Sequence, residues 1–314
     1  MKTFRAGGVS SHPSREPFIL QIPIKTVRPR DARGIFVTAM KLYRTAEGAV
    51  AEIDAERRLM KGFDWNELFV DSTSVEALQR QVWAAPPIDV AAMKAILPPI
   101  LDQEVWGAGV TYYRSREARI EESKDAAGGD FYDRVYHAER PEIFFKSTPH
   151  RVVGPGGPIR VRADSQWTVP EPELTVAINA RGEMIGYTVG NDVSARDIEG
   201  LNPLYLPQAK TYVGSCALGP CLLLTGEALE PETPILLEIL RDGEALFKGG
   251  TRLVEMKRSL RSLVEYLVRD NDFPHGCYLL TGTGVVPPDE IYLVSGDTVR
   301  ITIPPIGTLE NIVA

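Results

Sequence analysis

Three carboxylates, Glu171, Glu173 and Asp192, are the residues whose types and spacing best suit chemistry. Apolar residues alternate over 174–178, which predicts a strand with one apolar face and places Glu171 and Glu173 together on the other. The apolar run at 184–190 predicts a returning strand that brings Asp192 back beside them. Three oxygen ligands, completed by water, suit Mg²⁺ better than Zn²⁺. The spacing therefore indicates a hard-cation site.

A second interpretation of the glutamate pair stays open. Two neighbouring like charges repel each other, which proteins tolerate where water or a cation lies between them. Water alone would make Glu171 and Glu173 part of a solvated acidic strand face. An isolated Glu-x-Glu pattern does not separate this interpretation from a metal site.

Other catalytic chemistries find little support. Gly282-Thr283-Gly284 lacks the third glycine and the strand–helix context of a dinucleotide-binding loop. The chain contains no Gly-x-Ser-x-Gly elbow. The four histidines form no His-x-x-x-His pair, and we expect polar surface or core roles for them; they are His12, His137, His150 and His275.

The elements that must position the carboxylates begin after a polar, glycine-rich arm of about 16 residues. Strands are predicted over 36–43 and 49–53, around a turn at Glu47-Gly48. A helix follows, with Thr73 and Glu76 as a capping box and an apolar face of Val75, Leu78 and Val82. Pro86-Pro87 ends that helix.

A second proline pair, Pro98-Pro99, marks the predicted boundary between a small N-terminal domain (1–98) and a catalytic domain (99–314). The catalytic domain is rich in strand patterns. Residues 299–303 and 235–239 alternate between apolar and polar, and Asp242-Gly243 predicts a hairpin turn. One helix is predicted over 260–268 from its apolar periodicity. The fold class is therefore α+β and mainly β, with a small N-terminal α/β domain.

Composition narrows the function further. The 314 residues carry 35 Lys and Arg against 42 Asp and Glu, a net charge of −7, with no basic block for nucleic acid. No apolar run approaches the roughly 18 residues of a membrane span, and no secretory signal is evident. The three cysteines form no framework, so we expect buried thiols in a cytoplasmic protein; they are Cys216, Cys221 and Cys277.

Taken together, ordered segments beyond residue 106 resemble the fumarylacetoacetate hydrolase superfamily. These segments are 107–112, 142–146, 171–174, 190–197, 208–210, 218–220 and 281–283. The resemblance implies a mixed β-sandwich roll for the catalytic domain, and assembly as a homodimer or homotetramer. It also implies that Glu171, Glu173 and Asp192 bind a metal.

Within the superfamily, segments 140–146, 167–174 and 202–208 resemble the dehydratases of 2-keto-3-deoxy-D-arabinonate. The hydrolases of the superfamily have a water-activating histidine three residues beyond the tyrosine of their Gly-x-x-Tyr segment. Ser115 occupies that position here, and Ala118 occupies the position of the partner glutamate, with Glu117 one residue before it. Serine is a poor general base at neutral pH. The resemblance therefore favours an elimination over a hydrolysis.

What this resemblance implies is a Mg²⁺-dependent hydro-lyase, with Mn²⁺ or Ca²⁺ as substitute ions. The metal would chelate the carboxylate and keto oxygens of a small 2-keto-3-deoxy sugar acid and stabilise the enolate. Lys210 would bind the substrate and move the C3 proton, and Glu142 would be the general acid for the leaving hydroxyl. Lys146 and Thr283 would bind substrate. The product would be 2-oxoglutarate semialdehyde, formed in oxidative pentose catabolism.

Two other functions stay open. One is a hydrolase or decarboxylase of acylpyruvate-like diketo acids, which would need a base other than the missing histidine. The other is a non-catalytic protein that binds a metal or a sugar acid. Turnover of 2-keto-3-deoxypentonate, compared with turnover of acylpyruvate, separates these functions.

Overall fold

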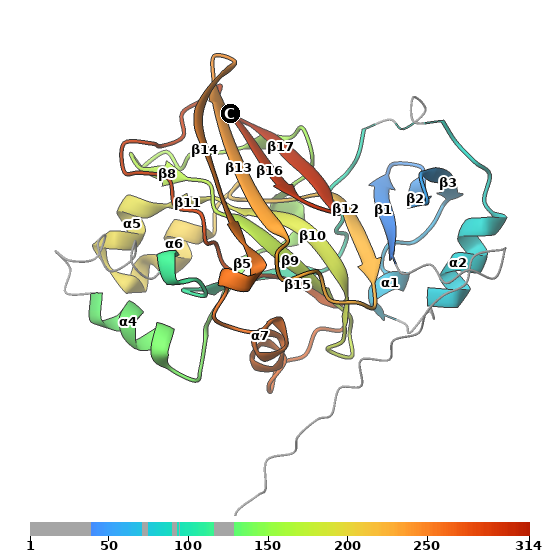
Figure 1. Ribbon diagram of the computed structural model, residues 1–314, viewed down its shortest axis with the longest axis horizontal. Coiled ribbons are helices and arrows are strands. Elements are labelled where there is room, and N and C mark those ends of the chain that lie inside the picture. The colour runs from blue at the N-terminus through green and yellow to red at the C-terminus, as the bar shows by residue number, and fades with distance from the viewer. Residues whose placement is uncertain (1–38, 71–74, 90–92, 94, 116–128) are drawn as a thin grey trace, which may run out of the picture.

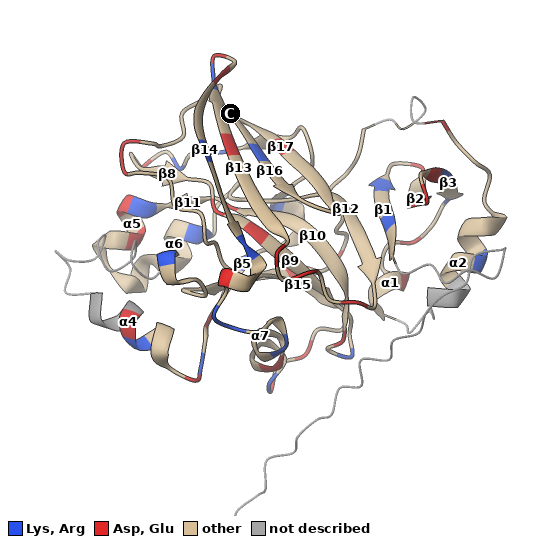
Figure 2. Cartoon of the chain, viewed as in Figure 1, with Lys and Arg blue, Asp and Glu red and all other residues tan. Residues whose placement is uncertain are grey.

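The structure is a computed structural model that describes residues 39–70, 75–89, 93, 95–115 and 129–314. Two sheets make up most of it, and short helices lie around their edges (Figure 1). Acidic and basic residues are interspersed along the chain on the face shown in Figure 2. No helix of the described residues is long and apolar enough to cross a membrane.

The larger sheet runs β3-β2-β1-β12-β10-β9-β15-β4-β5, with β6 paired to β12. Its neighbours are antiparallel except for the parallel pairs β15–β4 and β12–β6. The strands are β1 (Ala39–Thr45), β2 (Gly48–Ile53), β3 (Glu56–Lys61), β4 (Glu104–Gly109), β5 (Glu142–Ser147), β6 (Val152–Val153), β9 (Pro172–Ile178), β10 (Met184–Asp192), β12 (Cys216–Thr225) and β15 (Cys277–Leu280).

The smaller sheet has five strands in the order β14-β13-β16-β17-β7, and a further pair joins β8 to β11. Asp242 and Gly243 connect β13 to β14, both with positive φ (52° and 83°), which suits a tight hairpin turn and confirms the sequence prediction. The strands are β7 (Pro158–Ile159), β8 (Thr168–Val169), β11 (Ser194–Ala195), β13 (Pro234–Arg241), β14 (Glu244–Arg252), β16 (Thr298–Ile303) and β17 (Gly307–Val313).

Helices are few and short. The predicted helix over 260–268 is α7 (Leu260–Leu267), which Ser259 caps by accepting a hydrogen bond from the Ser262 N–H at 3.2 Å. Leu263, Val264 and Leu267 form its buried face. The others are α1 (Glu67–Val70), α2 (Val75–Ala84), α4 (Gly129–His137), α5 (Arg196–Leu201) and α6 (Leu206–Lys210), with 3₁₀ turns at Pro149–Arg151, Pro203–Tyr205 and Leu253–Glu255.

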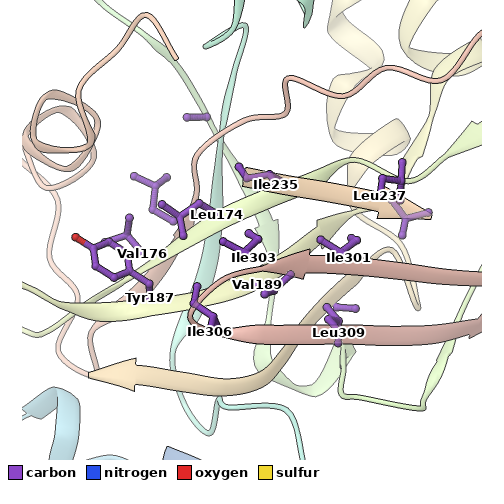
Figure 3. Packing of buried hydrophobic residues seen from close by; sticks show 14 of the residues in the cluster. Leu174, Val176, Tyr187, Val189, Ile235, Leu237, Ile301, Ile303, Ile306 and Leu309 are labelled. Atoms are coloured by element: carbon purple, nitrogen blue, oxygen red, sulfur yellow. The ribbon is translucent and has the colours of Figure 1, made fainter. Parts of the chain in front are cut away.

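The main core lies between the two sheets (Figure 3). Alternate apolar side chains of β9 and β10 face the apolar side chains of β13, β16 and β17. Burying one such aliphatic side chain contributes roughly 1.5–3 kcal/mol, so this interface fixes how the sheets stack. The labelled members are Leu174, Val176, Tyr187, Val189, Ile235, Leu237, Ile301, Ile303, Ile306 and Leu309.

The opposite face of the larger sheet carries a second core, shared with the N-terminal elements. Strand β1 pairs with β12, with Leu42 opposite Leu222, so the sheet continues from the N-terminal strands into the rest of the chain. Phe69 of α1 and Leu78 of α2 pack into the same cluster. The division into domains at residues 98 and 99 stays a prediction.

Several other predictions meet the structure directly. The strand predicted over 36–43 is described from Ala39 onward, and the helix with an apolar Leu78–Val82 face ends at Ala84, before the two prolines. The N-terminal arm with His12, and the proposed cap Thr73, lie outside the described residues. All three cysteines are buried and free, as expected.

Candidate metal centre and active site

The pairing of β9 with β10 places the three carboxylates together. Glu171 directly precedes β9, Glu173 lies on it, and Asp192 ends β10. Glu173 pairs with Gly190, and the Asp192 N–H donates to the Glu171 carbonyl at 3.0 Å. The predicted returning strand is therefore present, with Asp192 beside Glu171.

Burial decides between the two interpretations of these carboxylates. Glu171, Glu173 and Asp192 are 3%, 2% and 1% exposed, so they do not form a solvated acidic face. One oxygen from each lies within 4.8 Å of the others. Among the described residues they are the one group of three or more His, Cys, Asp or Glu side chains close enough to share a cation. A set of carboxylate oxygens fits a hard cation such as Mg²⁺.

Lys210, at the end of α6, reaches into this group. Its ammonium donates to Glu171 Oε2 at 2.6 Å, to Asp192 Oδ2 at 3.1 Å and to Ser194 Oγ at 2.7 Å. The side chain is 1% exposed. The predicted role of Lys210, to bind the substrate and move its C3 proton, stays a prediction.

Two further cations complete the charge balance. Arg196, the first residue of α5, donates from Nη2 to Glu171 Oε1 at 2.8 Å. Lys146 forms an ion pair with Asp192. Sequence reasoning did not single out Arg196 or Ser194, although both lie in the segment 190–197 that carries the family resemblance, within four residues of Asp192.

Glu173 differs from the other two carboxylates because no cationic side chain of the described residues forms an ion pair with it. Its Oε2 accepts a hydrogen bond from the backbone N–H of Gly282 at 2.6 Å. Burial, and then the charges of Asp192 and Glu171, raise the pKa of Glu173 well above its usual value, against smaller lowering effects of Lys210 and Gly282. A bound cation would favour the ionised form of this carboxyl.

Strand β5 supplies Glu142 and Lys146 on one face, with Phe144 between them. Opposite them on β4, Gly107 pairs with Phe144 and Gly109 pairs with Glu142. A Cβ on Gly109 would collide with the Glu142 carboxylate, and one on Gly107 would collide with the Phe144 ring. These glycines let the β5 side chains lie across β4.

The Thr283 loop joins the site through its neighbour Gly282. Thr283 itself is 4% exposed, and its hydroxyl accepts from the Val285 N–H at 3.1 Å and lies 3.2 Å from the Val285 carbonyl. Its side chain therefore closes a local turn. The role of Thr283 in substrate binding stays a prediction.

Ser115 also bonds locally. Its hydroxyl donates to the Tyr112 carbonyl at 2.8 Å and accepts from the Tyr112 N–H at 3.3 Å. The Tyr112 hydroxyl is buried without a hydrogen-bond partner among the described residues, and burial together with the charge of Glu173 raises its pKa. Sequence reasoning passed over this tyrosine side chain. Glu117 and Ala118 lie outside the described residues.

Comparison with known proteins places this chain in a family. Residues 108–314 match the model of the C-terminal domain of fumarylacetoacetate hydrolase. The chain therefore belongs to the fumarylacetoacetate hydrolase superfamily.

Its relatives include named dehydratases. The chain is 47% identical over 223 residues to the 2-dehydro-3-deoxy-D-arabinonate dehydratase of Saccharolobus solfataricus, covering 70% of this chain and 74% of that protein. It is 51% identical over 214 residues to a probable 2-keto-3-deoxyxylonate dehydratase of Haloferax volcanii, covering 68% of this chain and 73% of that protein.

A solved structure gives the same result for the fold. It is 2-keto-3-deoxy-D-arabinonate dehydratase complexed with magnesium and 2,5-dioxopentanoate, with a TM-score of 0.71 and 36% sequence identity. The match covers 88% of this chain and 98% of that one. The mainly β fold of the superfamily, predicted from the sequence, is confirmed.

Proposed function

We propose that this protein catalyses the Mg²⁺-dependent dehydration of 2-keto-3-deoxy-D-arabinonate to 2-oxoglutarate semialdehyde, in oxidative pentose catabolism. One observation carries the proposal: the buried Lys210 ammonium donates directly to Glu171 and Asp192 of the carboxylate triad. A candidate proton-transfer group thus lies within hydrogen-bond reach of two of the carboxylates that would hold the metal. The dehydratase names of the relatives support the same substrate.

The charges at the site favour an anionic substrate. Lys146, Lys210 and Arg196 balance three carboxylates, so a divalent cation would give the site a net positive charge. In a buried site such a charge attracts anions strongly. A 2-keto acid offers a carboxylate and an adjacent keto oxygen. When bound by Glu171, Glu173 and Asp192, Mg²⁺ supplies a Lewis acid that polarises the ketone.

Lys210 is our candidate for moving the C3 proton. With its contacts to Glu171 and Asp192 released to a bound cation, Lys210 would accept that proton as a neutral amine. The electron pair of the C3–H bond then forms an enolate with C2. The enolate then expels the hydroxyl at C4 as water, with Glu142 donating the proton that the leaving oxygen needs. Transfer of a C5 proton back to C3 gives an enol, which becomes the aldehyde when C4 takes up a proton and the hydroxyl on C5 gives one up. The overall change is loss of one water.

The local bonding of Ser115 supports elimination over hydrolysis. Its hydroxyl is engaged with the backbone of Tyr112, and serine is a poor base for activating water. The hydrolase or decarboxylase of acylpyruvate-like diketo acids therefore remains the alternative to exclude by assay.

A coupled assay tests the proposal. The purified protein is given D- or L-2-keto-3-deoxypentonate with Mg²⁺ or with EDTA, and a semialdehyde dehydrogenase reports the product. We expect Mg²⁺-dependent turnover that EDTA abolishes. Faster turnover of acylpyruvate than of either sugar acid would contradict the proposal, and so would full activity in EDTA.

Three finer points are proposed with it. Mn²⁺ or Ca²⁺ would substitute for Mg²⁺, since all three are bound by oxygen ligands. A homodimer or homotetramer is proposed from the family resemblance. A cytoplasmic location is supported by three free, buried thiols.

A further inference from the structure

Lys146 has no donor left for a substrate. Its ammonium carries three hydrogens and meets three acceptors, namely the Asp192 carboxylate, the Val193 carbonyl at 3.0 Å and the Lys210 carbonyl at 2.6 Å. The side chain is 0% exposed. A substrate oxygen would have to displace one of these acceptors and leave it buried and unpaired, at a cost in free energy.

The three acceptors belong to the residues that shape the site. Asp192 and Val193 form the junction between β10 and β11, and the Lys210 carbonyl ends α6. One ammonium therefore joins the metal-ligand strand to the backbone of the residue that carries the proposed base. A second, shared donor lies at the same place, because the Ser215 hydroxyl is 2.9 Å from the Lys210 carbonyl and 2.8 Å from the Tyr212 carbonyl.

We infer that Lys146 is a positioning residue, which fixes the Lys210 amine relative to the Asp192 carboxylate without touching the substrate. The inference rests on the proposed function and deepens it, because it assigns Lys146 a different role from the substrate binding that the family resemblance implied. This contact holds β5 near its end, and the same strand carries Glu142 at its start. The distance between Lys210 on α6 and Asp192 on β10 thus depends on a third element, strand β5.

Lys146→Met tests the inference because methionine keeps an apolar side chain of similar length and removes all three donors. A displacement of about 1 Å in a catalytic group can cost about 100-fold in rate, and we expect a loss in kcat of this order. KM for the sugar acid should change little, because no substrate contact is lost. Amides of Thr211 and Ser215, beside Lys210, should exchange hydrogen faster than in the wild type.

A matched control is Arg241→Met. Arg241 donates to Asp297 through two bonds of 2.8 Å, and Asp297 is fully buried, but this pair lies in the smaller sheet. We expect Arg241→Met to lower the melting temperature while kcat and the exchange at Thr211 and Ser215 stay at wild-type values. This control separates a general loss of stability from a displacement of the Lys210 amine.

Two outcomes would overturn the inference. A rise in KM with kcat unchanged would make Lys146 a substrate-binding residue, and wild-type kcat and KM in the folded variant would make it structural only.

If Lys146→Met does not accumulate, Ser215→Ala provides a second test. It removes the other donor near the Lys210 carbonyl, a hydroxyl, and should lower kcat as well, but by less than Lys146→Met. A wild-type kcat in Ser215→Ala would then count against the inference. Hydrogen exchange needs no turnover, so an inactive wild type would refute the proposed function alone.

Discussion

Two clusters of charged residues contain the same residue types at similar distances and differ in burial. At the candidate metal centre, Lys210, Arg196 and Lys146 contact Glu171 and Asp192, and these side chains are 0–4% exposed. On the outer face of the smaller sheet, Glu238 contacts Arg300 and Lys248, and Arg300 contacts Glu310, with side chains 23–67% exposed. Figure 2 shows charged segments of both signs on β13 and β16.

The difference shows that distance alone does not set the energy of an ion pair. Two unit charges 4 Å apart attract by about 1 kcal/mol in water and about 4 kcal/mol at the effective dielectric near a protein surface. Removing them from water also has a large cost, so a buried charge that loses its partner is expensive. The outer row stays solvated, and water compensates for a lost partner.

The largest expected effect is on turnover, in Lys210→Met. Loss of the proposed proton-transfer group should lower kcat about 1000-fold, which corresponds to about 4 kcal/mol of barrier. The same variant should bind Mg²⁺ more tightly, because the ammonium no longer occupies Glu171 and Asp192 oxygens. Steady-state kinetics and calorimetric titration measure the two effects. Lys248→Met, in the exposed row, should change neither, and a Lys210→Met variant with wild-type kcat would leave the base unassigned.

Next in size is the stability of Glu171→Gln. This change leaves Arg196 and Lys210 buried beside a neutral amide, which should cost about 3–5 kcal/mol of unfolding free energy in the absence of metal. Chemical denaturation with EDTA present measures it. Glu310→Gln weakens one contact in the outer row and serves as the control, with an unfolding free energy close to wild type in the same measurement. Equal losses of unfolding free energy in the two variants would show that burial does not change the energy of these ion pairs.

Glu173→Gln should stabilise the metal-free protein, whereas Glu171→Gln destabilises it. The pKa of Glu173 is raised in the folded protein, mainly by burial, so the folded state binds its proton more tightly than the unfolded state does. Metal-free stability is therefore lost as pH rises from the usual glutamate range towards the raised pKa. Glutamine removes that loss, so metal-free Glu173→Gln should melt above the wild type at neutral pH and with it at acidic pH. A melting temperature below that of the wild type at neutral pH would show that neighbouring groups stabilise the ionised Glu173 carboxylate in the folded protein.

The smallest effect is expected for Ser115→Ala. Among the described residues the hydroxyl bonds to the Tyr112 backbone alone, so its loss should cost stability on the scale of a helix cap, about 0.5–2 kcal/mol. Dehydration of the sugar acid should stay near wild type. A large fall in kcat would show instead that the Ser115 hydroxyl takes part in the reaction.

Local patterns in the sequence determined much of this protein. The alternation over 174–178 predicted a strand with an apolar face, and the Asp242-Gly243 hairpin and the helix over 260–268 followed from turn and periodicity rules. The carboxylates themselves were identified with their strand and its return. These features depend on neighbours a few residues away, which a sequence displays directly.

Tertiary structure alone decided the partners of those residues. Three contacts depend on elements distant in sequence: the three donors of Lys146 point into the protein, Arg196 pairs with Glu171, and Glu173 accepts from the Gly282 backbone. The continuation of the sheet from β12 into β1 is of the same kind. Sheet register and the packing of both faces fix which buried charges meet, because each buried charge must find a partner within hydrogen-bond reach, and no local pattern encodes that distance.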